Sequence, residues 1–347
     1  MKQKIKKVFR RNKVGGAENS EVPRITNDTV AEHREAVIGG ARKYIYPLQH
    51  SKHRIVIISG TLFVLAVVLF FTYTILSLYR FHSSSTFLYR ISQVLPFPIS
   101  KINGDYIAYE NYLFELRRYV HYYENQLKTD FNDPANKGQL DDFKKKAMER
   151  ITNIYYVNQL AKQHQVSVND QEINEQIAIS RSQNRLGNSD KVFEDVLKDY
   201  WGWSVNDFRR SLRSEILAQK LVAKLDTNTQ ARAELALSEL TSGADFAATA
   251  KKYSDEKETK ENGGEYGIPI DKTTRSVSAM VTDTLFNLKP GQHSQIINTG
   301  YSLEIVKNIE VNGTKVRAAH IVLNFKDINE YISDLRQQYK PKNYIKV

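Results

Sequence analysis

One uninterrupted apolar stretch limits how this chain can fold more than any other feature. Residues 55–78, "IVIISGTLFVLAVVLFFTYTILSL", contain no charged side chain. A helix needs about 20 apolar residues to cross a bilayer, so this stretch predicts one transmembrane helix. A cleaved signal peptide would have a shorter apolar core and a small-x-small cleavage site, and "YRFHSSSTFLYR" offers no convincing site after the stretch. We therefore expect an uncleaved signal anchor.

The charge of the chain is concentrated before this stretch. Residues 1–54 hold 13 Lys and Arg against 5 Asp and Glu, a net charge of +8 out of +11 for the whole chain. Basic residues flank membrane helices on the cytoplasmic side, which predicts a cytoplasmic amino terminus and extracytoplasmic domains in the cell membrane. The basic tail 1–54 could also suggest nucleic-acid binding, but beside a membrane helix we expect lipid contact or simple solvation, and no nucleic-acid partner.

Several kinds of chemistry have no support in the sequence. The chain has no cysteine, which leaves no thiol nucleophile, disulfide framework or Cys-based metal site. It also lacks H-E-x-x-H, G-x-S-x-G and G-x-x-x-x-G-K-[ST] patterns. We expect neither a metal nor a cofactor.

The part beyond the apolar stretch begins with a helical region. After a Ser-rich and Pro-rich connector, residues 79–100, apolar residues recur at helical spacing through most of residues 101–226. Ser204 starts an S-x-x-D cap before one of these helices, and Asn169 or Asp170 caps another. A short strand with an Asn103-Gly104 turn is expected ahead of the first helix.

Three phrases in this region have the order and spacing of a known domain. They are "INGDYIAYENY", "NQLAKQHQVSVNDQEINEQI" and "WSVNDFRRSLRSEILAQKLV". They resemble the amino-terminal chaperone domain of SurA-type and PrsA-type extracytoplasmic foldases. That resemblance implies unfolded polypeptide clients, and the Tyr-rich stretch 109–123 is either a client-binding face or ordinary packing.

Residues 227–325 contain four further phrases: "SGADFAATAKKYSDE", "GGEYG", "LFNLKPGQHSQII" and "TGY". Their order and spacing resemble a parvulin-type (PpiC) peptidyl-prolyl isomerase domain. The family begins with a strand containing "HIL", however, and nothing of that kind precedes Gln230. "RAAHIVL", residues 317–323, comes instead at the other end, after an Asn312-Gly313 hairpin turn.

Two interpretations fit this placement. In a circularly permuted parvulin, residues 316–324 pair antiparallel with residues 303–311 and fill the slot of the first strand. In the alternative, "RAAHIVL" opens a truncated second parvulin repeat. We also expect the end of the chain, residues 326–347, to return to the helical domain, with "DINEYISDLRQQ" as a helix and "NYIKV" as a strand beside "KINGDYIA".

The parvulin resemblance implies a set of site residues. Parvulins use two histidines, a Cys or Asp between them, and an apolar shelf for the proline ring. His320 matches the first histidine, and Glu256, with Asp255 as the near alternative, falls at the Cys/Asp position. The second histidine is replaced by Ser302, or by Glu304 if the strand has one extra residue. The shelf positions fall at Val277 and Val281, with Met280 adjacent and Phe286 nearby.

Together these features predict an α+β protein: one amino-terminal transmembrane helix, a mainly helical chaperone domain, and a parvulin-like domain with a small antiparallel sheet flanked by helices. The resemblance implies a peptidyl-prolyl cis-trans isomerase and chaperone for secreted or surface proteins, with unfolded or proline-containing polypeptides as partners. The altered site predicts weak activity. The alternatives are a non-catalytic holdase with a degenerate parvulin domain and, less favoured, an envelope scaffold.

Overall fold

The computed structural model describes residues 25–45, 48–182 and 189–347. The basic stretch at the start of the chain, residues 1–24, lies outside this range. The chain divides into one unit up to Tyr73 and a second from Thr74 to Val347. The first unit holds α1 (Asn27–Ile45) and most of α2 (Leu48–Ile75).

Within the described residues, one helical stretch is long and apolar enough to cross a membrane. It runs from Arg54 to Arg80 with a mean hydropathy of 2.7, and the apolar window is not buried inside the protein. The end of this stretch is a π-helical turn, Leu76–Arg80, in which Leu78 is fully buried. The predicted span 55–78 therefore ends inside protein, because the Tyr109 hydroxyl donates to the Leu78 carbonyl at 2.7 Å and holds it in the helical core.

Residues 79–100, expected to be a connector, contain folded elements instead. Helix α3 (Thr86–Val94) is capped by the Ser85 side chain, and Leu88 is fully buried in the helical core. Strand β1 (Pro98–Ile102) follows and pairs with β2 (Asp105–Ala108) through the Asn103-Gly104 turn. Short serine-rich segments have the composition of linkers, which is why the nine-residue helix was missed.

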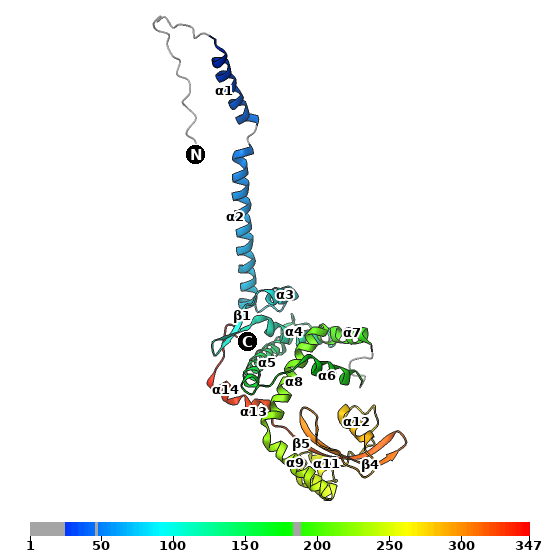
Figure 1. The fold of residues 1–347 in the computed structure, drawn as a ribbon. Coiled ribbons are helices and arrows are strands. Elements are labelled where there is room, and N and C mark those ends of the chain that lie inside the picture. The colour runs from blue at the N-terminus through cyan, green and yellow to red at the C-terminus, as the bar shows by residue number, and fades with distance from the viewer. Residues whose placement is uncertain (1–24, 46–47, 183–188) are drawn as a thin grey trace. The chain divides into compact units, whose positions relative to one another are not determined.

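Five longer helices form the body of the helical region (Figure 1). They are α4 (Tyr109–Asn125), α5 (Lys137–Gln163), α6 (Asp170–Ser182), α7 (Asp190–Trp201) and α8 (Val205–Leu225), with a 3₁₀ turn at Pro134–Asn136. Both predicted caps are present: Ser204 and Asp207 form a reciprocal capping box, and Asn169 accepts from the Glu172 N–H. Tyr109 and Tyr112 are buried in the core, which favours packing for these two rings.

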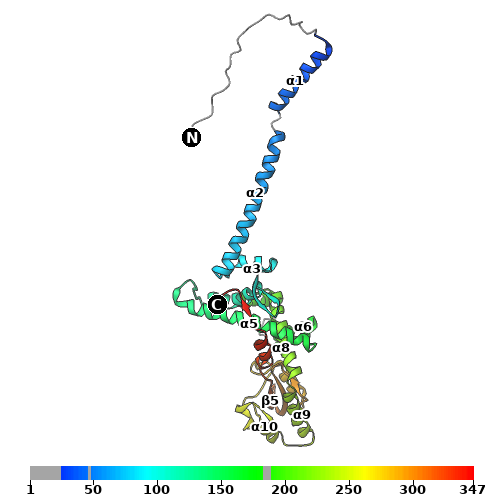
Figure 2. The same ribbon diagram turned by 90° about the vertical axis from the view of Figure 1, so that its left-hand side faces the viewer.

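The end of the chain returns to this helical body. The predicted helix is two short ones, α13 (Ile328–Tyr331) and α14 (Ser333–Gln338), and β6 (Lys342–Asn343) pairs with β1. Ile332 and Ile345 are buried in the helical core. The carboxy terminus lies beside β1 in Figure 1, and Figure 2 shows it near α5. The predicted return is confirmed, although the strand has two residues and begins earlier than expected.

Residues 227–324, between the helical body and the terminal segment, form a second three-stranded sheet with helices on both faces. Strands β3 (Ile297–Asn298), β4 (Ser302–Asn312) and β5 (Lys315–Asn324) lie in that order. Helices α9 (Thr227–Thr241) and α10 (Phe246–Tyr253) contact one face, α12 (Ala279–Asn287) contacts the other, and the short α11 (Lys257–Lys260) follows α10. Figure 1 shows α12 and α9 on opposite sides of the sheet.

Strands β4 and β5 form the hairpin that the sequence predicted. Leu303 pairs with Leu323 and Val306 with His320, with one register shift between Asn308 and Glu310. The antiparallel pairing is thereby confirmed. That β5 replaces the family's first strand, and that the domain boundaries fall where the sequence suggested, remain proposals.

Candidate functional site

His320 lies on the face of β5 that is turned toward α12. Its neighbour across the hairpin, Val306, is buried with the α12 residues, whereas the adjacent Ala319 and Ile321 are buried with α9 and α10. Successive side chains of a strand point to opposite faces, so the register alone determines the side on which the imidazole lies. Only 7% of His320 is exposed, and burial lowers its pKa to about 4.

Among the described residues, a threonine hydroxyl and a tyrosine ring interact directly with the imidazole. The Thr259 hydroxyl is hydrogen-bonded to Nε2 at 3.0 Å, and the Tyr266 ring lies with its centroid 4.0 Å from that of the imidazole. Burial raises the pKa of Tyr266, and the nearby Glu304 and Glu256 carboxylates raise it further. The tyrosine is therefore a neutral phenol and the histidine a neutral imidazole at pH 7.

A glycine turn fixes these groups against β5. The Gly264 N–H donates to the Thr259 carbonyl at 2.8 Å, and the Gly264 carbonyl accepts from the His320 N–H, also at 2.8 Å. Gly264 has φ +80°, and a Cβ atom there would lie 2.2 Å from the His320 carbonyl oxygen. Only glycine fits a backbone that approaches another strand this closely at positive φ.

The carboxylate of Glu304 adds a half-buried acid to the same face. Glu304 pairs with Val322, two residues from His320, and accepts a hydrogen bond from the Ser302 hydroxyl at 3.1 Å. Burial raises the pKa of Glu304; the Ser302 hydrogen bond opposes this, and the charge of Glu256 adds to it. Ser302 itself is 6% exposed and is also bonded to the Thr299 hydroxyl at 2.7 Å.

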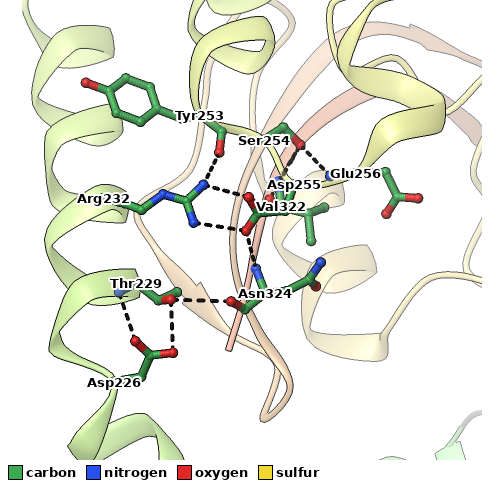
Figure 3. A network of polar contacts seen from close by, with 9 residues as sticks. All are labelled: Asp226, Thr229, Arg232, Tyr253, Ser254, Asp255, Glu256, Val322 and Asn324. Atoms are coloured by element: carbon green, nitrogen blue, oxygen red, sulfur yellow. Dashed lines mark hydrogen bonds and ion pairs between the residues drawn. The ribbon is translucent and has the colours of Figure 1, made fainter. Parts of the chain in front are cut away.

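The two acids of "YSDE" point to different neighbours. Asp255 forms a bidentate ion pair with Arg232, at 2.6 and 3.1 Å, and accepts from the Asn324 N–H at 3.0 Å (Figure 3). Its carboxylate therefore joins α9 to the end of β5. Glu256 takes no part in this ion pair and is close enough to Glu304 and Tyr266 to affect the pKa of each.

The residues expected at the proline shelf are distributed between the core and the surface. Val277 and Val281 are buried in the cluster between α12 and the sheet, at 5% and 0% exposure. Met280, on α12, is 44% exposed, and Phe286 is half-buried with the Lys272 ammonium 5.5 Å from its ring centroid. The two valines therefore serve as core residues, and Met280 is the accessible member of the set.

Thr259 and Tyr266 were missed by the sequence analysis. Thr259 lies in the charged "KETKEN" stretch, which has the composition of a solvated loop, and Tyr266 follows the two glycines of "GGEYG". The glycine pair was the available signal, because it marks a backbone that must come close to another segment. Glu304 was considered only as an alternative to Ser302.

A cleft lies in the second unit where α5 and α8 face the segment that follows β5. Its volume is about 830 Å³, and its lining combines apolar side chains with five amides and charges of both signs. The amides are Asn153, Asn158, Gln219, Asn324 and Asn329. The volume falls within the usual range for ligand pockets.

Comparisons with known proteins match both folded parts of the second unit. Residues 48–222, half of the chain, match the family model of the SurA-like N-terminal domain, and residues 216–310 match that of the PPIC-type PPIase domain, or rotamase. The second match ends before β5, so His320 lies beyond it.

Individual relatives carry the names of foldases and chaperones. The foldase protein PrsA of Caldanaerobacter subterraneus subsp. tengcongensis is 24% identical over 234 residues, 60% of this chain and 72% of that protein. The chaperone SurA of Albidiferax ferrireducens is 32% identical over 124 residues, 31% of this chain. The chain spans only 26% of that SurA and 46% of the PrsA of Lacticaseibacillus paracasei. A crystal structure of PrsA from Streptococcus pneumoniae, at 19% identity, covers 69% of this chain and 84% of its own, with a TM-score of 0.22.

Proposed function

This chain belongs to the SurA/PrsA-type foldases, and from that premise we propose that it is a membrane-anchored, extracytoplasmic foldase that isomerises prolyl peptide bonds in unfolded clients. The observation that carries the proposal is the buried, neutral imidazole of His320 on the polar face of the β4–β5 hairpin. The Thr259 hydroxyl on Nε2 and the Tyr266 ring against the imidazole support a fixed, neutral ring at this position.

The chemistry requires no covalent step. Rotation about a peptide bond meets a barrier of about 18 to 20 kcal/mol, and uncatalysed isomerisation takes on the order of 10 to 100 s. A site accelerates it by binding the twisted amide better than the planar one, through desolvation and placed hydrogen bonds. A neutral imidazole in a dry environment suits this role because it offers a donor without bringing a charge.

We assign the remaining site residues as follows. His320 is the catalytic residue, Glu256 and Glu304 provide the acidic surroundings, and Ser302 stands at the second histidine position. Met280 is the exposed edge of the proline shelf, with Val277, Val281 and Phe286 behind it. Asp255 supports the fold through Arg232 and has no direct part in the chemistry.

The client chain would be held in the cleft beside α5 and α8. Amide side chains can donate to and accept from an extended backbone whatever its sequence, which suits unfolded clients. The lining also contains basic and acidic side chains, including Arg150 and Glu215, so it would not favour clients of one charge sign.

The orientation in the membrane rests on the basic residues around the anchor. Arg42, Lys43, Lys52 and Arg54 precede the apolar stretch, and Arg80 and Arg90 are the basic residues that follow soon after. This asymmetry favours a cytoplasmic amino terminus. Protease added outside intact cells should cleave the part beyond residue 80 and spare an epitope at the amino terminus.

The proposed function is tested with the full-length chain in detergent micelles. We expect catalysed isomerisation of a prolyl peptide, weaker than that of a parvulin with both histidines, and suppression of client aggregation. His320→Ala should lower the isomerase rate about ten-fold or more and leave aggregation suppression nearly intact. An unchanged isomerase rate in His320→Ala would remove the catalytic role of β5.

A non-catalytic holdase is the second candidate. The serine at the second histidine position and the valines at the shelf favour it. Aggregation suppression with no isomerisation by the wild-type chain would establish this alternative.

A further inference from the structure

The position that the parvulin resemblance reserves for a second histidine does not hold His320 in place. Ser302 occupies it, and its hydroxyl is bonded to Thr299 and to Glu304. A buried imidazole still needs a hydrogen-bond partner that fixes the orientation of its ring. The groups that fix the ring must therefore come from elsewhere.

Thr259 is tied to His320 by a closed circuit of hydrogen bonds. Its hydroxyl meets His320 Nε2 at 3.0 Å, its carbonyl accepts from the Gly264 N–H, and the Gly264 carbonyl accepts from the His320 N–H. The hydroxyl and the imidazole are thus positioned by the same turn. Tyr266, two residues after Gly264, covers the imidazole with its ring.

The Thr259–His320 bond can run in either direction, and its direction decides which nitrogen of the neutral ring carries the proton. A threonine hydroxyl has one proton to donate, and within the described residues Nε2 is the partner that this hydroxyl has. If Thr259 donates, Nε2 is the unprotonated nitrogen and the proton of the neutral ring sits on Nδ1. Within the same residues Nδ1 forms no hydrogen bond, so its N–H is not used inside the protein.

We propose that Thr259 is a positioning residue that fixes His320 as the Nδ1–H tautomer and thereby presents Nδ1–H to the prolyl amide of the client. The last part rests on the proposed function. As the amide twists it loses its conjugation, and the lone pair of the prolyl nitrogen becomes able to accept a hydrogen bond. A donor fixed at that point stabilises the twisted state more than the planar one.

The tautomer can be read without any activity assay. The full-length chain, with ¹⁵N-labelled histidine in detergent micelles at pH 7, is examined by long-range ¹H–¹⁵N correlation, and His320→Gln identifies the signals of His320. We expect Nδ1–H alone in the wild type, a mixture or Nε2–H in Thr259→Val, and the wild-type pattern in Thr259→Ser, which keeps the hydroxyl. Nε2–H in the wild type, or an unchanged pattern in Thr259→Val, would overturn the proposal.

Kinetics separate this role from a purely structural one. Thr259→Val should lower kcat about ten-fold and change KM less than about two-fold, and Thr259→Ser should restore kcat. A wild-type chain without isomerase activity overturns the proposed function, and the ¹⁵N pattern then supports or overturns the tautomer assignment by itself. Equal kcat in Thr259→Val and wild type would show that the hydroxyl does not serve the reaction.

Discussion

The two faces of the β4–β5 hairpin are built from the same two strands and have opposite characters. Toward α9 and α10 the strands present Leu303, Ile305, Ala319, Ile321 and Leu323, all buried and apolar. Toward α12 they present Ser302, Glu304, Asn308 and His320 among the apolar residues. Polar groups inside a protein need hydrogen-bond partners, so the α12 face depends on a polar network that, among the described residues, the α9/α10 face does not have.

Mutations on the two faces should therefore have different effects, on stability for one face and on activity for the other. A change on the α9/α10 face removes packing and should lower stability, whereas a change on the α12 face should alter the chemistry at His320 with less effect on folding. Substitutions on each face and the pH dependence of stability test this division.

Gly264→Ala should destabilise the sheet most. The new Cβ atom would meet the His320 carbonyl oxygen at 2.2 Å, at a φ of +80° that alanine disfavours. Strain and overpacking together predict a loss of about 4 kcal/mol in the free energy of unfolding. Gly313→Ala is the matched control: it has φ +60° with open space around the Cβ position, and should cost about 1 kcal/mol by urea denaturation. Equal costs at the two positions would contradict the close approach of Gly264 to β5.

Ile321→Ala tests the apolar face. Ile321 is fully buried against the α9/α10 cluster, so removing its side chain leaves a cavity that should cost about 3.5 kcal/mol. The isomerase kcat per folded molecule should stay within about two-fold of wild type, because the side chain points away from His320. A loss of kcat without a loss of stability would reverse the assignment of the two faces.

The pH dependence of stability should report the burial of His320. Its pKa is about 4 in the folded protein and 6.5 in an exposed reference, so the unfolded chain binds the extra proton between these values. The stability held by the neutral ring is complete above pH 6.5 and is lost as the pH falls toward 4, by about 3 kcal/mol.

The control for this titration is His320→Gln. The raised pKa of Glu304 gives an opposite slope, with stability falling as the pH rises above about 4.5, and this slope is present in both proteins. The difference between the two denaturation series therefore isolates the histidine. A difference that does not vary between pH 4 and 7 would show that His320 is solvated.

Asp255→Asn should have the smallest effect and should be structural. The substitution removes the ion pair with Arg232, which is about one third exposed, so we expect a loss of about 1 to 2 kcal/mol in thermal unfolding. The isomerase kcat should not change. Glu256→Gln is the paired variant: it should leave stability nearly unchanged and lower the pKa of Glu304, since the charge of Glu256 raises it.

The sequence predicted those elements that are specified by a pattern of a few neighbouring residues. The Asn312-Gly313 turn identified the hairpin and its register beside the turn, but not the register shift between Asn308 and Glu310; the S-x-x-D pattern at Ser204 identified the start of α8. The buried end of the apolar stretch at Leu78 was not predicted, because an apolar side chain in a membrane and one in a protein core have the same composition signal.

The surroundings of His320 could be predicted only in part for the same reason. Alternation along β5 places the imidazole on the face opposite to that of Ile321. Thr259 and Tyr266, however, reach it from a turn that lies more than fifty residues before His320 in the sequence. The choice between Asp255 and Glu256 likewise depends on Arg232, which lies on another helix. Such contacts arise from tertiary packing and leave no periodic pattern in the sequence.

The catalytic role of His320 is tested most simply by comparing kcat/KM per folded molecule between His320→Gln and Ile321→Val. These variants change adjacent residues on opposite faces of one strand. We expect His320→Gln to lower kcat/KM about ten-fold or more at pH 7. Ile321→Val should cost about 1 kcal/mol of stability and leave kcat/KM within about two-fold of wild type. Equal kcat/KM values for His320→Gln and the wild type would contradict the catalytic role of His320.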